Sequence, residues 1–515
     1  MLDDGIRAAR ILLFFKPGAS RNAEALSHDC NITDTFTTHR CHNLSAFSNN
    51  KNMKTHKTKN TTKLALCAGA AALASLTPQV HAQSSDALID KLVDKGLLTV
   101  DEAKDLRNDA DKDFKTAFQA KTGMPDWVTS YKIGGDFRGR FEQFESANAN
   151  LVDRTRFRYR LRFGIVANMM DNMEVGFRLG SGDASGVGSQ SATGSPLSNN
   201  STMQDNFSKK MVYIDAAYGK WTAINSGDWL LSATIGKMDN PFTFTPMVFD
   251  PDLTPEGAAL QGAYTISDQH TLAFNGGAFV LDEEKASTYD PFLYGGQFIL
   301  NSKWNDKLSS SVGFGALAIN SPGALTAANV PYINQGNTRI GSGAKKGQLA
   351  YKFEPLITDA SVTYMLDTFL MYPGAFPIKL AGEQIHNPGA PKNNNGYWAG
   401  ITFGKSGAKK SWELNYRYEW LESDAWYDQM VDDDNGAYYA TTHYSNGTGT
   451  AGYFGGTNVK GHLVKASYSF TDSLTFSVTC FINDLITPPT QNTSGKKVDL
   501  TSSAIHLYAD FLWKF

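Results

Sequence analysis

Residues 154–163 read Arg-Thr-Arg-Phe-Arg-Tyr-Arg-Leu-Arg-Phe, and this stretch gives the clearest indication of the fold class. Arginine takes every even position, while four of the five odd positions are apolar (Phe157, Tyr159, Leu161 and Phe163). Successive side chains of a β-strand point to opposite faces, so the stretch predicts a strand with one apolar face and one cationic face. A column of cations needs water or nearby anions. The pattern fits the lumen of a membrane barrel or the exposed face of a soluble sheet.

The two ends of the chain favour the membrane barrel. Residues 505–515 alternate between apolar and polar positions and end in Phe515, which resembles the closing strand of bacterial outer-membrane proteins. At the other end, a lysine-rich start at Met53, an apolar run over 64–76 and a small-x-small site at 80–82 predict an export signal over 53–82. We interpret residues 1–52 as an upstream extension from a misplaced start codon, with a disordered tail as the alternative.

The charge balance argues against nucleic acid as a partner. Residues 1–82 carry 10 of the 48 Lys and Arg and 5 of the 51 Asp and Glu, so residues 83–515 have 38 basic and 46 acidic side chains and a net charge of −8. Of the four cysteines, Cys480 alone follows the export signal, which excludes an internal disulfide in that part. No run of 18 apolar residues follows the signal, so we predict no membrane helix.

Runs with period two continue from residue 131 to the end of the chain, and we count seventeen candidates, among them 229–237 and 395–405. A closed barrel with both termini on the periplasmic side needs an even number of strands. Assigning the weakest run, 347–353, to a long loop places all short turns at one end and all long loops at the other. We therefore predict an all-β, transmembrane, antiparallel up-and-down barrel over 126–515, with sixteen strands and eighteen as the alternative.

Residues 83–125 have a different pattern. Helical spacing over 86–95 ends at Gly96, and the capping-box pair Thr99 and Glu102 begins a second helix. We predict a short helical hairpin in the periplasm, with a loosely ordered linker as the alternative.

Arginines from three adjacent predicted strands lie on one face. An arginine on the lipid face would cost about 2–4 kcal/mol near the membrane midplane, so these side chains are assigned to the lumen. The predicted pore-lining residues are Arg138, Arg140, Arg156, Arg158, Arg160, Arg162 and Arg178, with Arg154 near the rim.

The connection 238–260 is the predicted counterpart of these arginines. Its four prolines and several apolar residues suit a loop that packs against the barrel wall, and we predict a constriction loop. Its acids, Asp239, Asp250, Asp252 and Glu256, are expected to face the arginines and to set up a transverse field across the pore. A solvated surface loop is the alternative. We interpret the acidic run 432–434 as a solvated loop tip and not as a divalent-cation site.

Several ordered motifs carry a family resemblance. Gly236-Lys237, Asn240-Pro241-Phe242 and the run from Phe249 to Gly257 resemble the constriction-loop region of the bacterial "putative porin" family. The segments 412–418, 455–462 and 92–103 are similar to the same family. The resemblance implies an outer-membrane barrel that passes small hydrophilic solutes, forms a homotrimer and has no catalytic residue.

We therefore expect passive diffusion through a water-filled pore, with outer-membrane lipid and small hydrophilic solutes as partners and no cofactor, metal or enzymatic activity. A solute-specific channel for anions or sugars is the alternative, and the preference for anions or cations stays open. A barrel hydrolase is a weaker hypothesis, because none of the histidines has a Ser or acidic partner at a suggestive spacing (His270, His386, His443, His462 and His506). A soluble sheet that binds polyanions conflicts with both terminal signals.

Overall fold

The computed structural model describes residues 89, 91, 93, 95, 99, 102–106, 108, 125–147, 153–184, 194–285, 287–331, 335–436, 455–487, 490–493, 496–499 and 503–515. The predicted upstream extension and export signal, 1–82, lie outside these residues. None of the helices in the described residues has the length and apolar character needed to cross a membrane.

Helical backbone occurs in the first of two compact units, at residues 89, 91 and 93 and again over 102–106. The second stretch starts with the predicted capping box. The Thr99 amide donates to Glu102 Oε2 at 2.9 Å, and the Glu102 amide donates to Thr99 Oγ1 at 3.3 Å. This exchange satisfies amides that a helix start leaves without intrahelical partners.

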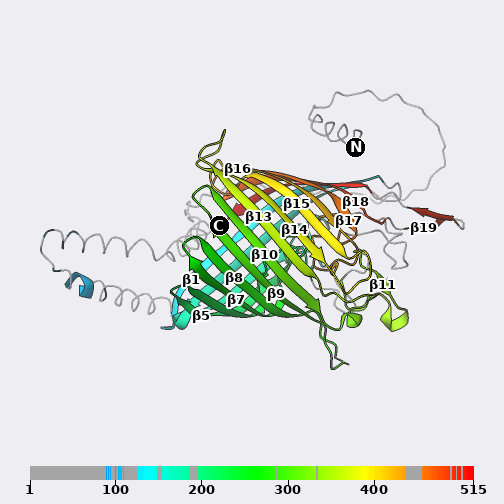
Figure 1. Ribbon diagram of the computed structural model, residues 1–515, viewed down its shortest axis with the longest axis horizontal. Coiled ribbons are helices and arrows are strands. Elements are labelled where there is room, and N and C mark those ends of the chain that lie inside the picture. The colour runs from blue at the N-terminus through cyan, green and yellow to red at the C-terminus, as the bar shows by residue number, and fades with distance from the viewer. Residues whose placement is uncertain are drawn as a thin grey trace, which may run out of the picture. The chain divides into compact units, whose positions relative to one another are not determined.

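The second unit is an antiparallel β-barrel of sixteen strands (Figure 1). The barrel strands are β1 (Val128–Ser146), β2 (Arg154–Met169), β3 (Met173–Gly182), β5 (Met211–Ser226), β6 (Trp229–Lys237), β7 (Glu256–Ser267), β8 (His270–Val280), β9 (Phe292–Lys303), β10 (Leu308–Ile319), β13 (Leu356–Leu366), β14 (Phe376–His386), β15 (Asn395–Gly404), β16 (Trp412–Leu421), β17 (Val459–Ser469), β18 (Leu474–Leu485) and β21 (Ala504–Lys514).

Each of these strands pairs with the next along the chain, and β21 pairs with β1 to close the ring. The closing register runs from Asp136 opposite Lys514 to Ser146 opposite Ala504. Next to it, the Gly135 amide donates to the Phe515 carbonyl at 2.9 Å, so the last residue takes part in closure. The predicted count of sixteen is confirmed, and the alternative of eighteen is wrong.

The remaining elements lie in the connections. The predicted demotion of 347–353 is confirmed, since β12 there pairs only with β11 in a separate two-stranded sheet. These short elements are β4 (Ser201–Thr202, paired with β2), β11 (Arg339–Ile340), β12 (Gln348–Leu349), β19 (Thr490–Thr493), β20 (Lys496–Asp499) and the 3-10 turns η1 (Met170–Asn172), η2 (Pro322–Ala324) and η3 (Gly343–Lys345).

Exposure alternates along the strands as the sequence pattern predicts. On β2, the apolar residues Phe157 and Leu161 are 55% and 44% exposed, whereas Arg158 and Arg160 are 9% and 7% exposed. The apolar face of the ring therefore points outward and the charged face points into the lumen. This arrangement matches what a lipid-embedded barrel requires.

The connections divide into two kinds, one at each end of the barrel. Short turns join β2 to β3, β5 to β6 and so on, while longer segments such as 183–210, 238–255, 320–355 and 422–458 join the other pairs. The described parts of the last three contribute to the main apolar core, whose members include Met247, Trp426 and Phe353. The largest buried core therefore lies among connections, and these connections fill part of the barrel mouth.

Candidate functional site

The seven predicted pore-lining arginines all contact polar groups inside the barrel. Seven carboxylates lie within 4.0 Å of six of these arginines, and Arg138 bonds to an amide oxygen. The partners are Asn200 for Arg138, Asp434 and Asp510 for Arg140, Glu142 for Arg156 and Arg158, Asp136 and Asp252 for Arg160 and Arg162, and Asp215 and Asp239 for Arg178.

Two acids of the predicted constriction loop touch the arginines directly. Asp252 Oδ1 lies 2.8 Å from Arg160 Nη1 and 3.4 Å from Arg162 Nη1. Asp239 accepts two bonds from Arg178, at 2.6 and 3.2 Å. At these points the loop therefore contacts the arginine wall, the lumenal face that carries the seven pore-lining arginines, and no open pore separates them. Ion pairing neutralises most of the charge that was expected to act across the pore.

The other two predicted acids lie elsewhere. Glu256 is the first residue of β7, so the connection spans 238–255 and not 238–260. Its carboxylate contacts Lys237 at 3.0 Å, on the neighbouring strand, and faces no arginine of the wall. Asp250 is buried, and its Oδ1 accepts a bond from the Asp252 amide at 2.7 Å. The expectation that all four acids face the arginines is wrong for these two.

The connection 238–255 crosses the lumen. At one side of the ring it meets the arginines of β2 and β3, as described above. At the far side, the Thr243 amide donates to Gln297 Oε1 on β9 at 3.0 Å, and the Thr245 amide donates to Glu383 Oε2 on β14 at 3.1 Å. Trp398 Nε1 on β15 donates to Thr245 Oγ1 at 2.9 Å. Bonds to both sides of the ring hold the segment across the barrel.

A second connection packs on the first. The Asp250 amide donates to the Met430 carbonyl at 2.7 Å, and the Asp432 amide donates to the Pro246 carbonyl at 3.0 Å. The acidic run 432–434 therefore lies inside the barrel, and the interpretation as a solvated loop tip is wrong. The apolar neighbours of this run drive it inward, since Trp426 and Val431 are fully buried.

The folding of these two connections brings three acids together. Carboxylate oxygens of Asp250, Asp432 and Asp433 lie within 4.8 Å of one another, a separation at which they could share a proton or a cation. Burial and the neighbouring carboxylates raise the pKa of Asp250 and of Asp433 well above the usual range, and they raise the pKa of Asp432 to about 7. Burial opposes ionisation of Asp434 too, but Arg140 and His506 outweigh it and lower the pKa of Asp434.

These shifts predict that the loop packing weakens as the pH rises. Acids with raised pKa values in the folded state stabilise it below their unfolded pKa near 4, and this contribution is lost as the pH rises through about 7. We expect hydrogen exchange of residues 422–436, corrected for intrinsic rates, to be about tenfold faster at pH 8 than at pH 5. Asp250→Asn should slow exchange at pH 8 and flatten the pH dependence.

Asp434→Asn is the control for this prediction. It removes a carboxylate whose pKa is lowered, so it should speed exchange at both pH values. Equal protection of residues 422–436 at pH 5 and pH 8 in the unmodified protein would contradict the prediction.

His506 has acidic neighbours that the sequence spacing did not reveal. Its Nε2 lies 3.1 Å from Glu142 Oε1, and its Nδ1 lies 2.9 Å from the Asp434 carbonyl oxygen. Its ring stacks on Phe144, with the centroids 4.0 Å apart. These groups come together because Phe144 lies opposite His506 in the closing strand pair. Among the described residues, these two partners contact both ring nitrogens.

For the other acidic partners, the sequence predicts only that they lie on the polar face of a strand. Asp136 and Glu142 alternate with Arg138 and Arg140 on β1, and Asp510 lies on the polar face of the last strand. Asp215 alternates with the exposed Val212 and Ile214, so it also belongs to a polar face. The sequence does not reveal the β3–β5 register shift beside it, where Arg178 lies opposite Ala216 and Leu179 lies opposite Ile214.

Residues 146–320 match the model of a family described as "Putative porin", which confirms the resemblance over that part of the chain. The chain is similar to solved structures of the Rhodopseudomonas blastica porin. A multiply substituted variant has a TM-score of 0.36 and 10% identity over 75% of this chain and 100% of that chain. A triple mutant has a TM-score of 0.35 and 10% identity over the same shares. No curated protein sequence matches. Over 146–320 the chain therefore resembles this family, and its fold is a closed antiparallel barrel of sixteen strands.

Proposed function

We propose that this porin-like barrel lets small hydrophilic solutes diffuse passively across the bacterial outer membrane. The observation that carries the proposal is the closed ring with an apolar outer face and a polar lumen. Such a ring satisfies its backbone hydrogen bonds within the sheet, so it can sit in lipid without an exposed edge. A polar lumen holds water and offers a path for solutes.

The connection 238–255 is the proposed constriction. Its bonds to Arg160 on one side and to Glu383 on the other support a fixed obstacle that narrows the lumen. The ion pairs between Asp239, Asp252 and the arginines make this obstacle nearly neutral in charge. We therefore propose that the constriction selects solutes chiefly by size and that this segment contributes little selectivity by charge.

Conductance of the purified protein in planar lipid bilayers tests the proposal. We expect stepwise single-channel currents, and we expect sugar-driven swelling of liposomes that slows as the sugar grows larger. The absence of both currents and swelling would overturn the proposal. Hydrolysis of phospholipid or peptide substrates would favour the enzyme hypothesis instead.

Shortening the constriction should enlarge the pore. Replacing residues 241–253 with a Gly-Ser-Gly linker removes the segment that crosses the lumen, and we expect the single-channel conductance to rise about twofold or more. Deleting residues 287–289, which are exposed in the connection between β8 and β9, is the control and should leave conductance unchanged. An unchanged conductance in the first variant would show that 238–255 does not limit the pore.

The resemblance to the family also implies a homotrimer, and we include this state in the proposal. Chemical cross-linking of the protein in outer-membrane vesicles, followed by electrophoresis without heating, should give a band at three times the monomer mass. A band at the monomer mass alone would exclude it.

A further inference from the structure

We propose that the lumen holds a binding site for small polyhydroxylated anions, such as sugar acids, on the wall formed by β9, β10, β13 and β14. The inference rests on the proposed function, because it names a solute class for the same pore. It places the anion preference on two lysines, Lys303 and Lys379, and not on the arginines of the opposite wall.

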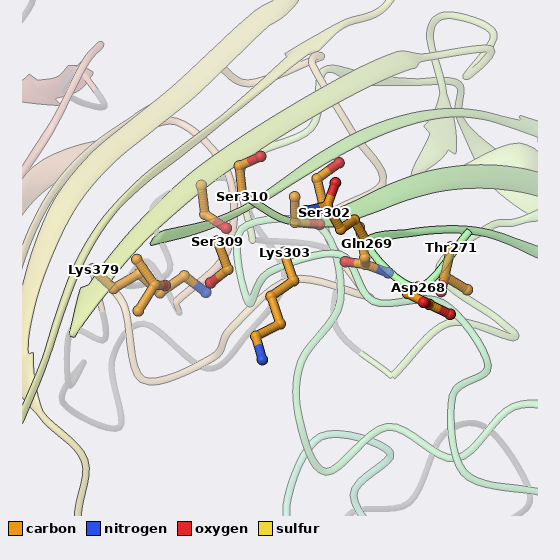
Figure 2. A pocket seen from close by; sticks show the side chains of 12 residues that line it. Asp268, Gln269, Thr271, Ser302, Lys303, Ser309, Ser310 and Lys379 are labelled. Carbon is orange, nitrogen blue, oxygen red and sulfur yellow. The ribbon is translucent and has the colours of Figure 1, made fainter. Parts of the chain in front are cut away.

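The two lysines belong to one row that runs across four strands. In the sheet register, Lys303 lies opposite Ser309, Ser309 opposite Thr363, and Thr363 opposite Lys379. Neighbouring strands lie about 4.8 Å apart, so the backbones of the two lysines are separated by roughly 14 Å. Two hydroxyl groups fill the space between two ammonium groups. Figure 2 shows Ser309 between the lysines in this row.

The row faces the lumen. Leu300, Val312, Val362 and Leu380 have the opposite parity on the same four strands and are among the exposed apolar residues of the outer face. Residues of the other parity must therefore point inward, because successive side chains alternate between faces. The next inward row adds Thr271, Asn301, Ser311 and Ser361, each opposite the one before it.

These side chains line a shared cavity of about 320 Å³. Its lining contains hydroxyl and amide groups, the two lysines and one acid, Asp268, which lies in the turn between β7 and β8 (Figure 2). Cavities that hold small molecules start at about 300 Å³. The hydroxyl groups can exchange hydrogen bonds with a polyol, and the ammonium groups can bind its carboxylate.

Neither lysine of this wall forms a buried ion pair, although the charge of Lys379 also acts on the partly buried carboxylate of Asp359 on β13. Lys303 Nζ lies 3.0 Å from Asp306, but both side chains are largely exposed, so water and salt screen this pair. Among the described residues, Lys379 has no carboxylate within 4.0 Å. The arginine wall differs, because carboxylates contact Arg140, Arg160 and Arg178 directly. A diffusing anion can reach a free ammonium group, whereas a guanidinium already held by carboxylates offers it less.

Current block by added solute tests the site. Sodium gluconate, glucose and sodium acetate are added separately to single channels of the unmodified protein in planar bilayers. We expect gluconate to reduce the current at about a tenfold lower concentration than glucose or acetate, since only gluconate joins a charge to hydroxyl groups. The double variant Lys303→Gln/Lys379→Gln should raise the half-blocking gluconate concentration about three- to tenfold and leave glucose block unchanged.

Lys307→Gln is the matched control. It removes one lysine at the same end of the barrel, but Lys307 pairs with Asp367 in a turn and does not line the cavity. Its gluconate block should equal that of the unmodified protein. Equal block by gluconate and glucose in the unmodified protein would overturn the inference, as would an Arg162→Gln variant that weakens gluconate block more than the double lysine variant does. If the unmodified protein formed no channels, the proposed function itself would fail.

Discussion

Replacing Asp510 with alanine is expected to destabilise the barrel by about 2–4 kcal/mol. Asp510 Oδ1 lies 2.8 Å from Arg140 Nε, and Asp510 Oδ2 lies 3.0 Å from Arg140 Nη2. The two residues lie directly opposite each other on β1 and β21, the pair of strands that closes the ring. The substitution leaves a buried guanidinium with fewer partners. Asp434, at 3.1 Å, and the ring of Tyr508 still contact it, which keeps the loss below that of a fully orphaned charge.

Urea unfolding of the protein in lipid vesicles measures this loss. Asp367→Ala is the control, because Asp367 pairs with Lys307 at an exposed turn and its removal should cost less than about 1 kcal/mol. The double variant Arg140→Met/Asp510→Leu should recover part of the stability, since it removes the unpaired charge. A loss in Asp510→Ala no larger than that of the control would contradict the prediction.

Trp426→Ala is expected to lower the free energy that holds the inward connections together by about 3–5 kcal/mol. The Trp426 side chain is fully buried, and its Nε1 donates to the Val248 carbonyl at 2.8 Å. Its ring also packs against Phe249 and Phe353, with centroids 6.2 and 6.3 Å away. One side chain thus joins three connections, so its loss should release the constriction while the sixteen-stranded sheet stays closed.

Two measurements separate these effects. Limited proteolysis should cut within 422–436 much faster in Trp426→Ala, and single-channel currents should become larger and noisier, while the unheated protein keeps its folded mobility in electrophoresis. Trp426→Phe keeps most of the apolar volume and loses only the hydrogen bond, so its effect should be about 1 kcal/mol. Unchanged proteolysis and currents in Trp426→Ala would show that the connections do not depend on this side chain.

The strands followed closely from the sequence. The predicted runs 229–237 and 395–405 match β6 and β15 within one residue at each end. The local rule works because a barrel strand faces lipid on one side and water on the other along its whole length. The local pattern at 347–353 is too weak to distinguish a strand from a loop. The need for an even number of strands assigned this run to a loop.

The sequence predicted the direction of the arginine side chains but not all of their partners. The inward direction of Arg158 and Arg160 is a property of their own strand. The contact between Asp252 and Arg160 depends on the path of a long connection, and the contact between Asp510 and Arg140 depends on the closing register. Both are contacts between residues far apart in the chain, and single-strand periodicity does not encode them.

The inward packing of the connection that begins at 422 differs most from the prediction. Its acidic run is preceded by Trp426, Tyr427, Met430 and Val431, which are buried. A connection with this apolar content is poorly suited to water, and that signal was available in the sequence. The acids followed the apolar residues into the lumen because they are joined to them in the chain.

Alternation along single strands was enough to predict the barrel and the face on which each arginine lies, and the even count favoured sixteen strands with eighteen left open. Only the closed ring shows what the arginines contact. It brought carboxylates from β1, β5, β21 and two connections onto them, and so changed a wall of free cations into a nearly neutral one. The reason is physical: alternation sets direction over neighbouring residues, whereas charge compensation depends on which distant groups the closed ring brings within a few ångströms.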